Sequence, residues 1–241
     1  MFSNFHTHTV FCDGADSPEE LVLEALRLGC PEIGFSGHSP LEEDTGSMTA
    51  QKVLDYCAEI RRLQKLYFGR IRILLGVEMD IFSHIDLSPF DYVIGAVHYV
   101  KKDGRKLAVD ESREGFLDAV RDAYDGDYYA LVAALPEKTG CSVIAHFDLI
   151  TKYNEGNALF RTDDPRYMAA ADAALDSLLG TAPRPLLEVN TGAMARGWRT
   201  EPYPERRLLD RWLSGGGELI LASDCHDKRQ LLYAFDGLKE L

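Results

Sequence analysis

Residues Phe5–Gly14 read FHTHTVFCDG and place two histidines one residue apart, with an aspartate five residues after the second. If the stretch begins as a β-strand, alternate side chains share a face, so His6 and His8 project together while Thr7 points the other way. Two imidazoles on one face can bind the same metal ion. A core histidine beside a surface histidine would give the same pair, so the interpretation depends on the rest of the chain.

The composition is that of a globular protein. The chain has 241 residues, of which 46% are hydrophobic and 27% charged, a length that suits one sizeable domain. No segment approaches the roughly 18 uninterrupted apolar residues of a membrane span, and the first residues lack the basic and apolar runs of a signal peptide. We therefore expect a single soluble domain over residues 1–241, in the cytoplasm, with no membrane partner.

The net charge and the cysteines argue against nucleic-acid binding, disulfides and a thiolate zinc site. The formal net charge is −13, and so acidic a surface repels phosphate backbones unless a basic stripe or bound metal intervenes, so we expect no nucleic-acid partner. The five cysteines are scattered and form no C-x-x-C motif, which argues against a disulfide framework and a thiolate zinc site. Cys12 and Cys225 each adjoin an aspartate, but on an alternating strand they would point away from it.

Short apolar runs rich in β-branched residues alternate along the chain with longer segments of helical period. This alternation is typical of repeated β-α units around a parallel sheet. The pattern predicts strands at residues 4–9, 32–36, 71–79, 92–98, 142–146, 186–190 and 218–223. It predicts helices at residues 18–28, 50–67, 113–124, 128–139, 165–179, 204–214 and 228–239. The expected fold class is α/β, with seven β-α units and no linker that would divide them.

Each predicted strand ends in residues that can bind metal or take part in catalysis. The series comprises His6 and His8, His38, Glu78, His98, His146, Asn190, and Asp224 with His226. In a β/α barrel the carboxyl ends of the strands meet at one mouth, so we expect these side chains to lie close together. A lone histidine there is more often a hydrogen-bonded helper, and a lone acid often caps the next helix. Six histidines in such positions indicate a shared role.

The shared role that we infer is metal binding. Buried carboxylates and imidazoles cost several kcal/mol each unless something cationic pairs with them, and divalent ions do so. A ligand set of imidazole and carboxylate suits zinc, manganese or iron. The number of ligands exceeds what one ion uses, so we expect two or three ions about 3.5–4 Å apart, as in hydrolytic phosphate chemistry. His84 is left without a role.

These motifs resemble the polymerase-and-histidinol-phosphatase (PHP) superfamily. FHTHTVFCDG, GFSGHSP, GVEMD, IGAVH and SDCHD follow one another in the family's order between Phe5 and Asp227. AHFDLITKYN and GAVHYV are similar to the histidinol-phosphate phosphatases of this superfamily, rather than to its polymerase-attached domains. The resemblance implies a distorted β/α barrel of seven units with a trinuclear metal site.

The resemblance also implies how the ligands are shared. One ion would take His6, His8, Glu78 and Asp224, and a second would take Glu78 as a bridge with His98 and His146. A third would take Asp13, His38 and His226. Every one of these positions has the expected residue type.

The phosphate-binding residues are less well defined, because NTGAMARGWR is spaced differently from the family pattern. We select Arg161 and Arg196, since each follows a strand end by several residues and a guanidinium matches phosphate oxygens. Asn190 is the third substrate-binding candidate. The alternative is that both arginines are solvated surface residues.

The primary hypothesis is a phosphomonoesterase that hydrolyses L-histidinol phosphate through a metal-bridging hydroxide. Asp224 and His226 are the catalytic candidates, because they could hold the water that protonates the leaving alkoxide. A phosphodiesterase or nuclease is the first alternative, although the acidic charge argues against a polynucleotide groove. A generalist phosphoesterase and a non-catalytic metal-binding module are the others, and the complete ligand set argues against the module.

Overall fold

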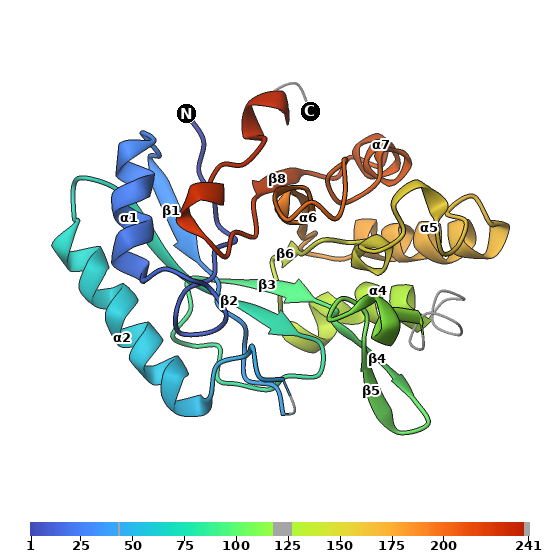
Figure 1. The fold of residues 1–241 in the computed structure, drawn as a ribbon, viewed down its shortest axis with the longest axis horizontal. Coiled ribbons are helices and arrows are strands. Elements are labelled where there is room, and N and C mark those ends of the chain that lie inside the picture. The colour runs from blue at the N-terminus through green and yellow to red at the C-terminus, as the bar shows by residue number, and fades with distance from the viewer. Residues whose placement is uncertain (43, 118–126, 239–241) are drawn as a thin grey trace. The chain divides into compact units, whose positions relative to one another are not determined.

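The computed structural model describes residues 1–42, 44–117 and 127–238 (Figure 1). The chain divides into two compact units, one formed by Met1–Ile94 with Leu221–Leu241 and the other by Gly95–Ile220. Our expectation of a single domain stays a prediction. No helix within the described ranges combines the length and the apolar character that crossing a membrane requires.

The first unit is built from two helices and parallel strands. Its elements are α1 (Pro18–Arg27), β1 (Glu32–Phe35), α2 (Ala50–Leu66), β2 (Arg72–Asp80) and β3 (Tyr92–Ala96), which continues into the second unit. β1 and β2 are parallel neighbours, and β3 follows β2 in the sheet. Figure 1 shows α1 and α2 along one side of β1 and β2. These bounds confirm the predicted α/β alternation to within one or two residues.

The start of α1 follows directly from its sequence. The Ser17 hydroxyl accepts from the Glu20 backbone N–H, and the Glu20 carboxylate accepts from Ser17 N at 3.0 Å, which completes a capping box. Pro18 occupies the first turn, where its missing N–H costs no hydrogen bond. The apolar face of α1 can therefore begin packing at Leu21, which is fully buried.

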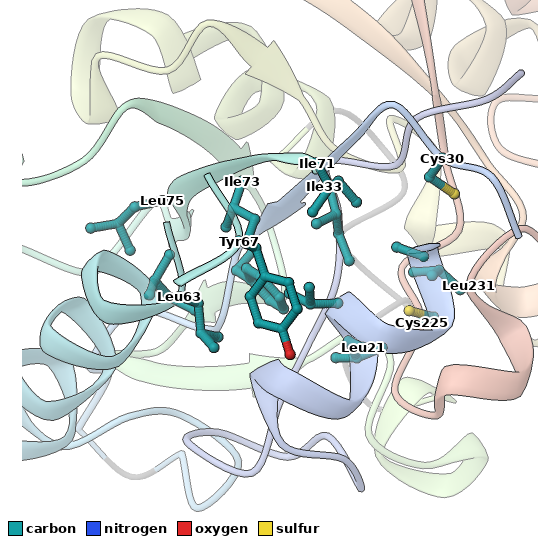
Figure 2. Close-up of a cluster of buried hydrophobic side chains, with 14 of the residues drawn as sticks. Leu21, Cys30, Ile33, Leu63, Tyr67, Ile71, Ile73, Leu75, Cys225 and Leu231 are labelled. Atoms are coloured by element: carbon teal, nitrogen blue, oxygen red, sulfur yellow. The ribbon is translucent and has the colours of Figure 1, made fainter. Parts of the chain in front are cut away.

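A hydrophobic cluster joins these helices to the strands (Figure 2). Leu63 of α2 and Leu21 of α1 are buried there with Ile33 of β1 and Ile73 of β2. Each such side chain contributes about 1.5–3 kcal/mol when it leaves water. Cys225 is also a member, which gives this thiol a packing role.

The N-terminal segment is not the regular strand that we predicted for residues 4–9. It forms isolated parallel bridges, Asn4 with Ile33 on one side and Thr7 with Cys225 on the other. Side chains replace part of the backbone ladder, because His6 N donates to Asn4 Oδ1 at 3.1 Å and Thr7 N donates to Ser36 Oγ at 3.1 Å. The segment therefore lies between β1 and the chain that follows β8, without strand geometry of its own.

The second unit contains the remaining helices and strands. Its elements are β4 (Tyr99–Lys102), β5 (Arg105–Ala108), α4 (Asp127–Thr139), β6 (Val143–Ile144), α5 (Pro165–Leu179), β7 (Leu186–Asn190), α6 (Gly192–Ala195), α7 (Arg206–Ser214) and β8 (Leu219–Ala222), whose last residues belong to the first unit. β6 and β7 are parallel, and β8 neighbours β7. α4 and α5 lie side by side, with Tyr129 Oη donating to Tyr167 Oη at 2.7 Å (Figure 1). The helix predicted at residues 113–124 extends beyond the described residues.

The hairpin of β4 and β5 was not predicted. Its turn is Asp103-Gly104, with φ of 50° and 76°, the left-handed geometry that two-residue hairpins require and that an Asp-Gly pair favours. The dipeptide was a usable signal. It was missed because the flanking residues are rich in lysine and arginine, which are poor strand indicators.

The predicted C-terminal helix at residues 228–239 is wrong within the described residues. The segment forms two short 3-10 turns, η3 (Lys228–Gln230) and η4 (Phe235–Leu238). Ala234 between them has φ of 60°, which an α-helix does not tolerate. Leu231 and Phe235 are nevertheless both buried, so the apolar spacing that suggested a helix serves packing through turns.

The Asn4 side chain should be a principal support of the first unit. Its amide donates to Ser223 Oγ at 2.6 Å and to Leu231 O at 2.9 Å, and it is 1% exposed. Asn4→Ala leaves these partners buried without a donor, so we expect a loss of about 2–4 kcal/mol in unfolding free energy. Urea denaturation would measure it.

The matched control is Gln51→Ala, which removes an amide whose hydrogen bond to Asp55 lies on the surface. Its effect should stay within about 0.5 kcal/mol. Equal effects of the two variants would contradict a supporting role for Asn4.

Candidate metal centre

Histidines and carboxylates from distant parts of the sequence gather in the first unit. The N-terminal segment brings two of them, the following turn brings a third, and residues in or after β1, β2 and β8 bring the others: His6, His8, Asp13, His38, Glu78, Asp224 and His226. All seven positions were predicted from sequence, and the structure brings them together. Two groups within them have the spacing of a metal site, one of His6, His8 and Asp224 and the other of His8, Asp13, His38 and His226.

The buried part of the cluster has two imidazole nitrogens facing two carboxylate oxygens. His6 Nε2 lies 3.2 Å from Glu78 Oε2 and 3.6 Å from Asp224 Oδ1. His8 Nε2 lies 3.5 Å and 3.1 Å from the same two oxygens. His8 Nε2 is buried, as is His6 Nε2. Four donor atoms that converge in this way fit a divalent cation of the zinc, manganese or iron type.

Glu78 occupies the centre of the arrangement. Besides His6 and His8, its Oε2 lies 3.0 Å from His38 Nδ1, so one carboxylate oxygen faces three imidazoles. The side chain is 1% exposed. Glu78 lies inside β2, and its backbone forms a parallel bridge with that of His38. The strand therefore holds the Glu78 side chain in place beside His38. The geometry suits a carboxylate shared between ions.

The outer part of the cluster is organised by Asp13. Its Oδ2 lies 3.1 Å from His226 Nε2 and 3.6 Å from His38 Nε2, and its Oδ1 lies 3.4 Å from His8 Nδ1. A tight turn brings it back to His8, because Gly14 N donates to Thr9 O at 3.1 Å. A Cβ on Gly14 would come within 2.4 Å of Thr9 N, so the turn requires glycine.

The electrostatics of the cluster favour positive charge between its carboxylates. Burial would lower the pKa of His8, but hydrogen bonds to Asp13 and Asp224 raise it well above its ordinary value. Burial would also lower the pKa of His38, but the charge of Glu78 raises it to about 9. Burial would raise the pKa of Asp13, but hydrogen bonds from His226, His38 and His8 hold it well below its usual range. The carboxylates of the cluster thus favour positive charge between them, which divalent ions can supply.

Cys12 lies closer to the cluster than the sequence suggested. It is part of a turn, not a strand, so the expected alternation does not apply, and its Sγ lies 3.6 Å from His8 Nδ1. Burial would raise its pKa, but the hydrogen bond to His8 lowers it to about 7. His84, in contrast, is exposed beyond the end of β2.

The other two predicted histidine ligands belong to the second unit. His98 follows β3 and His146 follows β6, and their ring centroids are 5.2 Å apart. The backbone N–H of His146 donates to Glu188 Oε2 at 3.2 Å. Their predicted sharing of an ion with Glu78 joins residues of both units and stays a prediction.

The predicted substrate-binding residues also belong to the second unit, and their role stays a prediction. Asn190 is buried, with its Nδ2 donating to Glu188 Oε2 at 3.0 Å and its Oδ1 accepting from Gly192 N at 2.9 Å. Arg161 is exposed and forms a two-point ion pair with Asp163. Arg196 is half-buried at the end of α6.

Sequence reasoning did not select Arg199, which lies three residues after Arg196. Its guanidinium lies over the Tyr203 ring, 4.8 Å from the centroid, and donates to Thr151 Oγ1. Tyr203 is 1% exposed. The stacking that distinguishes Arg199 from a surface arginine depends on a contact between loops, so no sequence signal marked it.

Comparisons with known proteins identify the family of the chain. The PHP domain model matches residues 4–192. A protein of Deinococcus radiodurans named "Probable histidinol-phosphatase" is 30% identical over 98% of this chain and 91% of its own length.

Two solved structures have the same fold. One, from Listeria monocytogenes and assigned as a histidinol phosphatase, has a TM-score of 0.85 at 20% identity and covers 98% of this chain and 99% of its own. The other is the histidinol phosphate phosphatase of Lactococcus lactis, complexed with zinc, L-histidinol and phosphate, with a TM-score of 0.71 at 21% identity over 99% and 93% of the two chains. These structures confirm the predicted PHP-type α/β fold. The chain therefore belongs to the PHP domain family, and within it to the group of the histidinol-phosphatases.

Proposed function

We propose that this protein is a metal-dependent phosphomonoesterase that hydrolyses L-histidinol phosphate to L-histidinol and phosphate. The observation that carries the proposal is the convergence of His6, His8 and His38 on Glu78 in the first unit. Asp224 faces His6 and His8 from the other side. The family membership supports the phosphatase activity, and the names of the relatives support the substrate. A location in the cytoplasm would suit such an enzyme.

Two or three divalent ions would be held by the predicted sets. These are His6, His8, Glu78 and Asp224; Asp13, His38 and His226; and Glu78 with His98 and His146. When bound, zinc, manganese or iron ions supply Lewis acidity, which lowers the pKa of water and neutralises phosphate oxygens. Reaction with water forms one P–O bond and breaks the ester P–O bond, and the departing alkoxide takes up a proton.

The residues proposed to manage that proton are Asp224 and His226. Asp224 has φ of 47°, which directs the chain so that its carboxylate and the following His226 both face the cluster. His226 Nε2 lies 3.1 Å from Asp13 Oδ2, and its side chain is 25% exposed. The other ring nitrogen, Nδ1, lies 3.0 Å from Asp224 O, so Asp224 and His226 would hold the proton-donating water through the ion that they bind.

Three other functions would be compatible with a metal centre of this kind: a nuclease, a generalist phosphoesterase and a non-catalytic metal-binding module. A nuclease would require a basic groove, and the net charge of −13 argues against one. A generalist phosphoesterase would use the same ligands without selecting the organic group. A non-catalytic module is the least supported, since each predicted ligand position of the first unit has a residue that can bind metal.

The substrate prediction is a preference for L-histidinol phosphate. Its kcat/KM should exceed that of p-nitrophenyl phosphate or a dinucleotide by about a hundredfold or more, because contacts to the amine and imidazole stabilise the transition state. Phosphate release from the three substrates would measure it. Similar rates on all three would indicate a generalist, and preference for the dinucleotide would indicate a nuclease.

The metal prediction centres on Glu78→Gln. The variant should lose at least one of the two or three equivalents of metal and most activity, because an amide is a poor bridging ligand. Elemental analysis and phosphate release would be measured on the same preparation. His84→Ala is the matched control and should retain both metal and activity. A more damaged His84 variant would refute the assignment of the histidines.

The phosphate-binding prediction concerns Arg161→Ala and Arg196→Ala. Each should lower kcat/KM for L-histidinol phosphate by roughly ten- to a thousandfold, the scale of one charge-assisted phosphate contact. Arg72→Ala, which removes an exposed guanidinium paired with Glu32, is the control and should leave kcat/KM unchanged. If either variant retains the wild-type kcat/KM, as the control should, the arginine that it replaces is a surface residue without a role in phosphate binding.

A further inference from the structure

The second unit positions a carboxylate beside His98 that has no part in the proposed metal or phosphate contacts. The β4–β5 hairpin turns the chain back on itself, with Tyr99 opposite Ala108. The ladder ends where Val109 N donates to His98 O at 2.8 Å. Asp110 is the next residue, so the hairpin returns it to the point where β3 ends.

A second loop fixes Asp110 from the side of His146. Lys152 Nζ donates to the Asp110 carbonyl oxygen at 2.7 Å, and Tyr153 Oη donates to the same oxygen at 2.7 Å. Lys152 Nζ also lies 3.2 Å from Asp110 Oδ2. The backbone of Asp110 is thus clamped through its carbonyl group, and within the described residues its carboxylate has this one ion pair, on Oδ2.

Asp110 is more accessible than Glu188 and Asp148, two other carboxylates of this unit. Glu188 is 1% exposed and already accepts from His146 N and Asn190 Nδ2. Asp148 is fully buried and accepts from Glu205 N at 3.0 Å. The Asp110 side chain is 27% exposed. Of these three, it is the carboxylate that can meet a dissolved molecule.

Asp110 is held as an anion by its ion pair with Lys152, whose Nζ lies 3.2 Å from Oδ2. A fixed anion repels the phosphate group of a substrate and attracts a cation. L-histidinol phosphate has a primary ammonium group on the carbon next to its ester carbon.

We infer that Asp110 is a specificity-determining residue that binds the ammonium group of the substrate. The inference rests on the proposed function and adds to it the contact that would distinguish an amino alcohol ester from other phosphate esters. The hairpin and the Lys152-Tyr153 pair are then positioning elements. They hold the carboxylate so that little conformational freedom is lost when the ammonium group binds.

The test compares L-histidinol phosphate with its deamino analogue, 3-(imidazol-4-yl)propyl phosphate, in the full-length metal-loaded enzyme. Asp110→Asn should lower kcat/KM for L-histidinol phosphate by about 10- to 100-fold and for the analogue by less than about threefold, because the analogue has no ammonium group to lose. Asp172→Asn, which removes a carboxylate paired with Arg207 at 2.5 Å, is the control and should change neither value.

Other outcomes would overturn the inference. Equal losses on both substrates would assign Asp110 to a structural role or to orienting Lys152, and loss of bound metal would make it a ligand. Lys152→Met removes the ion pair but keeps the carboxylate, so the preference for the ammonium substrate should survive in it.

Thermal unfolding would check that each variant is folded. If Asp110→Asn does not fold, Asp110→Glu replaces it, and the displaced carboxylate should lower the preference by about threefold or more. Equal effects on the two substrates in that variant would also refute the inference. A wild-type enzyme that hydrolyses other phosphate esters but not L-histidinol phosphate would instead refute the proposed function, and the inference with it.

Discussion

The first unit depends on the burial of one carboxylate among three imidazoles. Glu78 Oε2 lies within 3.5 Å of nitrogens of His6, His8 and His38, at the end of a strand that is buried on both faces. An uncompensated carboxylate in such a place would cost several kcal/mol. The neighbouring carboxylates raise the pKa values of His8 and His38, against the effect of burial. The cluster therefore favours positive charge, which divalent ions can supply.

The irregular N-terminal segment brings His6 and His8 to that arrangement. A regular strand would pair its backbone along both edges, whereas this segment uses the Asn4 and Ser36 side chains for some of those hydrogen bonds. The same Asn4 amide reaches Ser223 and Leu231, and so connects the beginning of the chain to the segment that bears Asp224 and His226. One buried side chain thus aligns the first and last ligands of the cluster.

The second unit contains the chemistry that would separate this enzyme from others with the same metal ligands. Its loops combine an accessible carboxylate at Asp110 with cations at Lys152, Arg196 and Arg199. Loops tolerate change better than the strands that precede them, so selectivity can evolve there while the metal centre is preserved.

The sequence by itself determined the α/β class, most helix bounds and the gathering of His6, His8, His38 and their partners, because strand ends and ligand residues coincide in a pattern that few other folds would require. It could not determine the hairpin, the broken C-terminal helix or the turn that brings Cys12 to His8, since these depend on backbone angles and on neighbours distant in sequence. Asp110 illustrates the limit. Nothing in its local sequence marks it, and only the return of the hairpin to His98 and the clamp by Lys152 and Tyr153 place its carboxylate where a substrate cation could bind.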